Sequence, residues 1–249
     1  MSGWPDGYGR LILQEVGSTL DEGLARATSE PAPFWILSHR QTAARGRRGR
    51  VWAMPPGNFA ATLILRPEEP PRVAALRSFV MSLALHRAFV EVCGRGDAFA
   101  LKWPNDVLLR GGKVAGILLE STGQGGAMGP LAIGVGVNLV AAPGAEDVEA
   151  GAIRPVSLRG ELGLAVSAEA FLEALARAYA PLEQQVTTHG FAPIRTAWLQ
   201  HAARLGEVIT ARTGREEIAG TFEDVDADGN LLLRTPKEMR AIAAADVFF

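Results

Sequence analysis

Four arginines within six residues are the feature that most limits how this chain can fold: Arg45, Arg47, Arg48 and Arg50. Like charges at this density repel one another unless an anion or a carboxylate lies between them. Buried strands are predicted on either side, so the cluster has to form a loop between them. A loop of this kind fits either a lid that orders over a small anionic ligand or a solvated basic surface. Residues 41–52 alone leave both alternatives open, and without a bound anion we expect these arginines to lack favourable partners.

The charge balance makes the basic loop a local feature rather than part of a general nucleic-acid-binding surface. The chain has 249 residues, enough for one large domain with a small appendage, and carries a formal net charge of -2. Cys93 is the single cysteine, which excludes an internal disulfide and indicates a reducing compartment. We find no signal-peptide pattern and no uninterrupted apolar run long enough to cross a bilayer. These observations predict a cytoplasmic protein.

The order of predicted elements indicates an α/β (α+β) domain in residues 1–204. Ser18 is expected to cap a helix through about Thr28, whose first turn carries the acidic residues Asp21 and Glu22. Further helices are predicted at 71–92, 157–162, 167–185 and 193–203. Strands are predicted at 11–16, 34–38, 59–65, 101–104 and 131–140, with a hairpin, 107–110 and 113–120, around the turn Gly111-Gly112.

A second, smaller domain is predicted in residues 205–249. Five short runs of β character follow one another here, separated by Thr-Gly, Asp-Gly and Thr-Pro turns: 207–212, 216–222, 231–234, 240–243 and 247–249. This spacing is typical of a small SH3-like β-barrel.

The strand predicted at 131–140 has two unlike faces. One face carries only small residues and then an amide: Ala132, Gly134, Gly136 and Asn138. Such a stripe fits tight packing of a helix on the sheet. It equally fits a flat floor for a ligand whose edge is held by Asn138.

A short segment that must fold back on itself gathers the remaining charged candidates: Lys102, Asn105, Asp106 and Lys113. Two cations with an amide and a carboxylate at one end of a sheet suit a phosphate group together with Mg²⁺. The alternative is a surface salt-bridge cluster. The rigid apolar pair Trp103-Pro104 at the corner favours the phosphate site, because it fixes the direction of the polar side chains.

Four ordered motifs in the sequence resemble those of the biotin protein ligase family: QTAARGRRGRVW, KWPND, GGKVAGILLE and IGVGVN. The resemblance extends from about Leu11 to Phe249. It implies a class II synthetase-like mixed sheet flanked by helices, followed by an SH3-like barrel. It further implies an ATP-dependent ligase that activates biotin as biotinyl-5′-AMP and transfers it to a lysine of a biotin carboxyl carrier protein, part of acetyl-CoA carboxylase or a related carboxylase.

The resemblance assigns a role to individual residues, which are expectations at this stage. The expected catalytic residues are Lys113 and Arg47. The expected biotin-binding residues are Ser18, Thr19, Gln41, Arg45, Gly46, Arg47 and Lys113. The expected ATP- or adenylate-binding residues are Arg50, Trp52, Lys102, Asn105, Asp106 and Asn138, and Asp106 is the expected Mg²⁺ ligand.

Two positions depart from the family pattern. Leu20 stands where the family commonly has asparagine, and Ala44 stands where it commonly has glycine. Leu20 puts one side-chain contact to the ligand in doubt, and Ala44 should stiffen the loop slightly. Only about ten residues precede the first strand, so we expect no helix-turn-helix and no DNA partner.

The alternatives to a biotin ligase are a lipoate–protein ligase, a nucleic-acid-binding module that uses the basic loop, and a binding protein without catalysis. The first has a related fold, but the arginine loop together with KWPND favours biotin. The second would need interleaved aromatic residues or a wider basic face. Membrane association is not expected, and the sequence leaves the oligomeric state open between a monomer and a homodimer.

Overall fold

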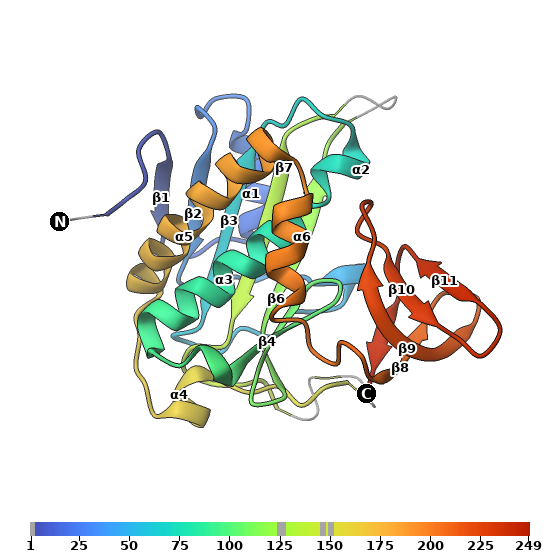
Figure 1. The fold of residues 1–249 in the computed structure, drawn as a ribbon. Coiled ribbons are helices and arrows are strands. Elements are labelled where there is room, and N and C mark those ends of the chain that lie inside the picture. Colours follow the sequence, from blue (N-terminus) through green and yellow to red (C-terminus); the bar gives the residue numbers. More distant parts are fainter. Residues whose placement is uncertain (1–2, 124–127, 145–147, 149–151) are drawn as a thin grey trace.

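The larger part of the protein is built on a mixed β-sheet (Figure 1). The structure is a computed structural model that describes residues 3–123, 128–144, 148 and 152–249. Within these residues seven strands lie in the order β1-β2-β3-β7-β6-β5-β4, and only β1 and β2 pair in parallel. The strands are β1 Gly9–Leu13, β2 Phe34–Ser38, β3 Phe59–Leu65, β4 Phe99–Lys102, β5 Asp106–Leu109, β6 Gly112–Ser121 and β7 Leu131–Val137.

Helices cover both faces of this sheet. On β2, Trp35 and Leu37 pack into the large core with α3 (Arg77–Cys93) and α5 (Ala168–His189). The alternate β2 residues Phe34 and Ile36 pack into a smaller core with α1. The other helices are α1 Thr19–Arg26, α2 Pro71–Ala74, α4 Leu158–Leu162 and α6 Ala192–Leu199. The predicted mixed sheet flanked by helices is thus confirmed.

The long apolar segment after β3 differs from its prediction. It forms two helices, α2 and α3, instead of one. By length and composition alone the segment Pro71–Cys93 could cross a membrane, although Arg72, Arg77 and Arg87 interrupt its apolar residues. However, 72% of the most apolar 18-residue stretch of this segment is buried inside the protein. Its longer helix, α3, is therefore a core helix in contact with α5 and α6.

The β5–β6 hairpin turns one residue earlier than predicted. Leu109 pairs with Gly112, so the two turn residues are Arg110 and Gly111. Their φ angles are 50° and 81°, and positive φ at both central residues is what a two-residue type I′ turn requires. Gly112 instead starts β6, where only a glycine fits because a Cβ would lie 2.3 Å from a methyl carbon of Val156.

Other bounds shift by a few residues. The first strand ends at Leu13 rather than 16, the first helix at Arg26, and the β7 strand at Val137. Residues 15–17 leave the sheet because Val16 makes a single bridge to Gln41 instead of continuing the β1–β2 ladder. This bridge brings the start of α1 next to the arginine loop.

The C-terminal residues form a separate antiparallel sheet of five strands in the described chain, in the order β11-β10-β9-β8-β12. The strands are β8 Val208–Arg212, β9 Glu217–Val225, β10 Leu231–Arg234, β11 Met239–Ile242 and β12 Asp246–Phe248. Figure 1 shows this sheet beside the large one, next to α6. Trp103 of the rigid corner donates from Nε1 to the carbonyl oxygen of Gly229, 3.0 Å away, and so ties the two sheets together.

A stacked pair of histidines makes the stability of the fold depend on pH. His86 of α3 lies against His201, with ring centroids 3.9 Å apart. Burial lowers the pKa of His86 from 6.5 to about 4, and the neighbouring His201 adds to the effect. The unfolded chain therefore binds more protons than the folded one between these two pH values. We expect the free energy of unfolding to fall by about 2 kcal/mol as the pH drops from about 6.5 to about 4.

Thermal or denaturant unfolding across this pH range measures the effect. Carboxylates titrate in the same range, so the contribution of the pair is isolated by comparing the protein with its His86→Gln variant. That variant should lose stability less steeply as the pH falls, whereas His189→Gln at an exposed position should follow the parent protein. Parallel curves for all three proteins would contradict a role for the buried pair.

Candidate active site

A cleft of about 690 Å³ opens on the α1 face of the large sheet. The arginine loop, the start of α1, the β4–β5 corner, β6, β7 and β12 all contribute to its wall. All thirteen residues expected from the sequence line it: Ser18, Thr19, Gln41, Arg45, Gly46, Arg47, Arg50, Trp52, Lys102, Asn105, Asp106, Lys113 and Asn138. The structure brings these positions together, while their individual roles stay predictions.

One end of the cleft is lined by small hydroxyl and amide groups. Ser18 caps α1 and accepts from the backbone N–H of Asp21. Thr19 donates its backbone N–H and its hydroxyl to Oε1 of Gln41, at 2.7 and 3.0 Å. Thr62 of β3 donates to the Thr19 hydroxyl at 2.9 Å. Uncharged hydrogen-bond donors and acceptors in fixed positions suit a neutral ring that forms hydrogen bonds, such as a cyclic urea.

In the floor of the cleft, two glycines of the small-residue stripe pack against side chains of the protein. Above Gly134 lies Leu20 of α1, close enough that a Cβ on the glycine would stand 2.9 Å from the leucine Cγ. This is helix packing. Above Gly136 lies the ring of Trp52, where a Cβ would stand 2.5 Å from Cε2. The aromatic ring of the loop thus lies flat on the sheet inside the cleft.

The departure at Leu20 has a physical explanation. Its side chain is 5% exposed and fills the space over Gly134 as part of the smaller core. At this position the chain therefore contributes an apolar wall where the family pattern would contribute an amide. Ala44 keeps its place in the loop, since its carbonyl oxygen accepts from the backbone N–H of Trp52 at 3.1 Å.

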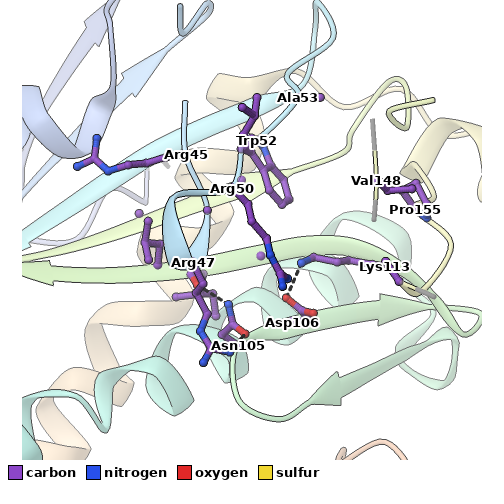
Figure 2. A pocket seen from close by; sticks show the side chains of 18 of the residues that line it. Arg45, Arg47, Arg50, Trp52, Ala53, Asn105, Asp106, Lys113, Val148 and Pro155 are labelled. Carbon is purple, nitrogen blue, oxygen red and sulfur yellow. Dashed lines mark hydrogen bonds and ion pairs between the residues drawn. The ribbon is translucent and has the colours of Figure 1, made fainter. Parts of the chain in front are cut away.

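The corner predicted to hold phosphate is a compact charged cluster. Nζ of Lys113 lies 2.7 Å from Oδ1 of Asp106, and Nζ of Lys102 lies 3.9 Å from Oδ2 of the same carboxylate. Burial lowers the pKa of Lys102, whose side chain is 10% exposed, while the charge of Asp106 opposes that shift. Asn105 is fixed by its Nδ2, which donates to the carbonyl oxygen of Ile117 at 2.7 Å. Figure 2 shows Lys113 and Asp106 pointing toward each other within the cleft.

The arginine loop folds as a narrow hairpin. Arg45 and Val51 form an antiparallel bridge, and the N–H of Gly46 donates to the carbonyl oxygen of Arg50 at 2.7 Å. A short turn of 3₁₀-helix, Arg47–Gly49, forms the tip. Arg48 has a φ of 58°, in the left-handed region that favours glycine.

Arg45 is held by carboxylates of the chain, which corrects the expectation that the loop arginines lack partners without a ligand. Its Nη1 and Nη2 each lie 2.7 Å from an oxygen of Asp21, and its Nε and Nη2 lie 3.1 and 2.6 Å from the oxygens of Glu120. These hydrogen bonds raise the pKa of Arg45, and the Arg45 guanidinium lowers the pKa of Asp21. In Figure 2 the Arg45 side chain points away from the charged corner.

The other three arginines divide into two groups. Arg48 and Arg50 both donate to Oδ2 of Asp246, at 2.5 and 3.4 Å. The partly buried Arg47 instead donates from its Nη1 to Oδ1 of Asn105 at 3.3 Å (Figure 2). Burial lowers the pKa of Arg47. Among the described residues its hydrogen-bond partner is thus a neutral amide, which leaves this guanidinium suited to an anion.

Asn138 is bound to the protein on both sides of its amide. Its Nδ2 donates to the carbonyl oxygen of Val156 at 3.0 Å, and its Oδ1 accepts from Asn58 at 3.4 Å. With 2% exposure, it fixes the chain after β7 at the edge of the cleft.

Sequence reasoning missed three carboxylates at this site. Glu120 ends one of the four motifs but had no assigned role, and Asp21 was interpreted only as an acidic residue in the first turn of a helix. Asp246 lies 196 residues from Arg50, so no local pattern could connect the two. The cleft also includes Arg212, Val247 and Phe248 of the C-terminal sheet, which no sequence signal indicated.

A metal would have few ligands from the protein. Among the described residues no group of three His, Cys, Asp or Glu side chains could hold an ion. Asp106 offers one carboxylate in the charged corner. Mg²⁺ in phosphate-transfer sites commonly takes one or two carboxylates together with oxygens of the substrate phosphates. The donor set therefore fits Mg²⁺ only in company with a phosphate-bearing substrate.

Comparison with known families matches both parts of the chain. Residues 11–138 match the biotin/lipoate A/B protein ligase family, and residues 205–249 match the biotin protein ligase C-terminal domain. The biotin–[acetyl-CoA-carboxylase] ligase of Paracoccus denitrificans is 53% identical over 238 residues, which cover 96% of this chain and 99% of that protein. The bifunctional ligase/repressor BirA of Escherichia coli is 30% identical over 92% of this chain and 70% of its own length.

A solved structure shares the fold. The biotin protein ligase from Aquifex aeolicus, in complex with biotin and ATP, superposes with a TM-score of 0.82 at 23% identity, over 96% of this chain and 97% of that one. The arrangement of a large mixed sheet followed by a small antiparallel sheet is thus that of a known enzyme architecture.

Proposed function

The chain belongs to the biotin/lipoate A/B protein ligase family, and from this premise we propose that it is a biotin–protein ligase. It joins biotin to ATP as biotinyl-5′-AMP, with release of pyrophosphate, and passes the biotinyl group to a lysine of a biotin carboxyl carrier protein. Residues 1–204 are proposed as the catalytic unit and residues 205–249 as the appended domain, a division supported by the separate family match at 205–249.

One observation carries the proposal: a neutral hydrogen-bonding end and a cationic corner share one cleft. Thr19 and Gln41 form the first, and Lys102 and Lys113 belong to the second. Biotin has a neutral ureido ring at one end and a carboxylate at the other, so the molecule would extend along this axis. Lys113 and Arg47 would then stand where its carboxylate meets the α-phosphate of ATP.

The first step brings two anions together. The biotin carboxylate oxygen attacks the α-phosphorus, the bond to the pyrophosphate oxygen breaks, and negative charge builds on the phosphoryl oxygens. Fixed cations aimed at that charge lower the barrier more than they lower the energy of the bound substrates. Lys113 is proposed to bind the carboxylate and the developing charge, while Arg47 binds a phosphate oxygen. Mg²⁺, held by Asp106 and the substrate phosphates, would supply further neutralisation of the phosphate charge.

The second step depends on the exclusion of water. Biotinyl-5′-AMP is a mixed anhydride, which water hydrolyses unless the cleft is closed. The arginine loop, with Trp52 on the floor of the cleft, is proposed as the lid. The carrier's lysine then attacks the acyl carbon as the free amine, AMP leaves, and an amide bond forms.

Biotin is favoured over lipoate as the substrate. The Paracoccus relative, similar over nearly the whole chain, is named a biotin ligase, and the C-terminal match is to a domain of biotin ligases. We propose the cytoplasm as the location, on the strength of the single free cysteine.

We propose that DNA is not a partner. The formal net charge of -2 gives little general attraction to phosphate backbones, and the arginines that would supply it are paired with carboxylates or turned into the cleft. The protein should not retard duplex DNA in a gel at physiological salt. A sequence-specific shift that depends on biotin would contradict this.

Transfer to a carrier tests the proposed function. The protein is incubated with ATP, Mg²⁺, biotin and an unmodified biotin carboxyl carrier domain, and the carrier is analysed by mass spectrometry. We expect one biotinyl group on one lysine, and none when that lysine is replaced by arginine. A carrier that stays unmodified, while an established biotin ligase modifies it under the same conditions, would refute the proposal.

A further inference from the structure

The arginine loop is joined to the C-terminal sheet by one carboxylate. Oδ2 of Asp246 accepts from Nη1 of Arg48 at 2.5 Å and from Nη2 of Arg50 at 3.4 Å. The Asp246 side chain is 22% exposed, whereas those of Arg48 and Arg50 are 46% and 45% exposed. The carboxylate is therefore the less hydrated member of both pairs, which strengthens the attraction relative to a fully solvated pair.

Asp246 stands on a rigid element. It begins β12, where it pairs with Arg212 of β8. Its neighbours Ala245 and Val247 are 0% and 4% exposed, so the backbone on both sides is anchored in the core. A carboxylate placed in this way cannot follow the loop if the loop moves.

Among the described residues, side-chain bonds join the tip of the loop, Arg47–Gly49, to the rest of the protein: Arg48 bonds to Asp246 and Arg47 to Asn105. Within the loop, the bridge between Arg45 and Val51 and the bond from Gly46 to Arg50 join the loop only to itself. Arg48 also holds a φ of 58°, which a side-chain-bearing residue keeps only where contacts compensate. Its bond to Asp246 is a contact that can do so.

We propose that Asp246 is a positioning residue, through which the C-terminal sheet holds the arginine loop over the cleft before substrate binds. Arg47 and Arg48 are adjacent, and one points into the cleft while the other points to Asp246. Fixing Arg48 therefore fixes the direction of Arg47 beside Asn105. The role in catalysis rests on the proposed function, whereas the fixing of the loop does not.

Hydrogen exchange of the protein without substrates tests the fixing of the loop. Asp246→Asn keeps the shape and removes the charge, and amides of residues 45–51 should then exchange about three to ten times faster. Glu223→Gln is the matched control, because it breaks a 2.7 Å ion pair with Arg234 in the same sheet, away from the cleft. The control should leave exchange in the loop unchanged. Equal exchange in the parent protein and in Asp246→Asn would overturn the proposal.

A double variant separates this contact from a general loosening of the sheet. Arg48→Gln should speed exchange in the loop, and Asp246→Asn combined with Arg48→Gln should exchange no faster than Asp246→Asn alone. Additive increases would show that the two residues act independently and would overturn the pairing. Asp246→Glu retains the charge, so the loop amides of this variant should exchange nearly as slowly as those of the parent protein.

Kinetics tests the consequence for the reaction. In Asp246→Asn the loop must be ordered by the substrate, so the KM for ATP in biotinyl-5′-AMP synthesis should rise about fivefold while kcat stays within about twofold. A fall in kcat with an unchanged KM would overturn the positioning role. If the parent protein makes no adenylate, the proposed function fails, and the exchange result still decides whether Asp246 fixes the loop.

Discussion

Lys113→Ala is expected to reduce biotinyl-5′-AMP formation by about 100- to 1000-fold, while the protein stays folded. The lysine Nζ lies in the charged corner, 2.7 Å from Asp106, and 5.5 Å from the centre of the Trp52 ring. Removing it leaves the biotin carboxylate and the α-phosphate to approach each other with one cation fewer. The backbone of residue 113 should keep its place, since its N–H and carbonyl oxygen bond to Arg154 and Val156.

The measurement is adenylate synthesis at saturating ATP and biotin, accompanied by thermal unfolding. Lys237→Ala is a suitable control, because Lys237 is exposed and lies in the C-terminal domain. That variant should keep full activity. Synthesis by Lys113→Ala within tenfold of the parent protein would remove Lys113 from the catalytic role, provided that the variant unfolds at the same temperature as the parent.

Arg47→Gly is expected to release biotinyl-5′-AMP roughly ten to a hundred times faster than the parent protein. The reason is that the bound adenylate loses one charge-assisted hydrogen bond. Arg47 lines the cleft and donates to a neutral amide, whereas Arg45, Arg48 and Arg50 donate to carboxylates of the chain. The guanidinium of Arg47 is therefore well placed to bind an anion. Adenylate should still form, because Lys113 and Lys102 remain in place.

The test measures the rate at which adenylate leaves the variant, with the released adenylate trapped in solution. Arg40→Gly adds the same backbone freedom just before the loop, and Arg40 is paired with Glu15 at the surface, away from the cleft. Release from this control should match the parent protein. If Arg47→Gly also releases adenylate at the parental rate, Arg47 does not close the cleft over the product.

Residues close together in sequence were predicted well because local chemistry fixes them. The segment from Lys102 to Lys113 must fold back on itself, and the structure does bring Lys102, Asp106 and Lys113 into one cluster. Ser18 was predicted as a helix cap from the acidic residues that follow it, and its side chain does accept from Asp21. The bounds of β2 and β3 agree because a buried strand is a short apolar run with polar ends.

What the sequence could not predict depends on contacts across the fold. The sequence predicted that the arginine loop needs an external anion, since no acidic residue stands within it. Its counterions come instead from Asp21, Glu120 and Asp246, on three different elements. Similarly, the sequence could not decide whether the small residues of β7 pack against a helix or against a ligand. In the structure Leu20 lies over Gly134 and Trp52 lies over Gly136.

The most direct test of the central claim is the identity of the activated acid. The protein is mixed with ATP and Mg²⁺ and offered biotin or lipoate at equal concentration, and the small-molecule products are identified by mass spectrometry. A biotin–protein ligase gives biotinyl-5′-AMP and pyrophosphate with biotin, and little or no adenylate with lipoate. Adenylate formed from lipoate alone, or from neither acid, would contradict the account.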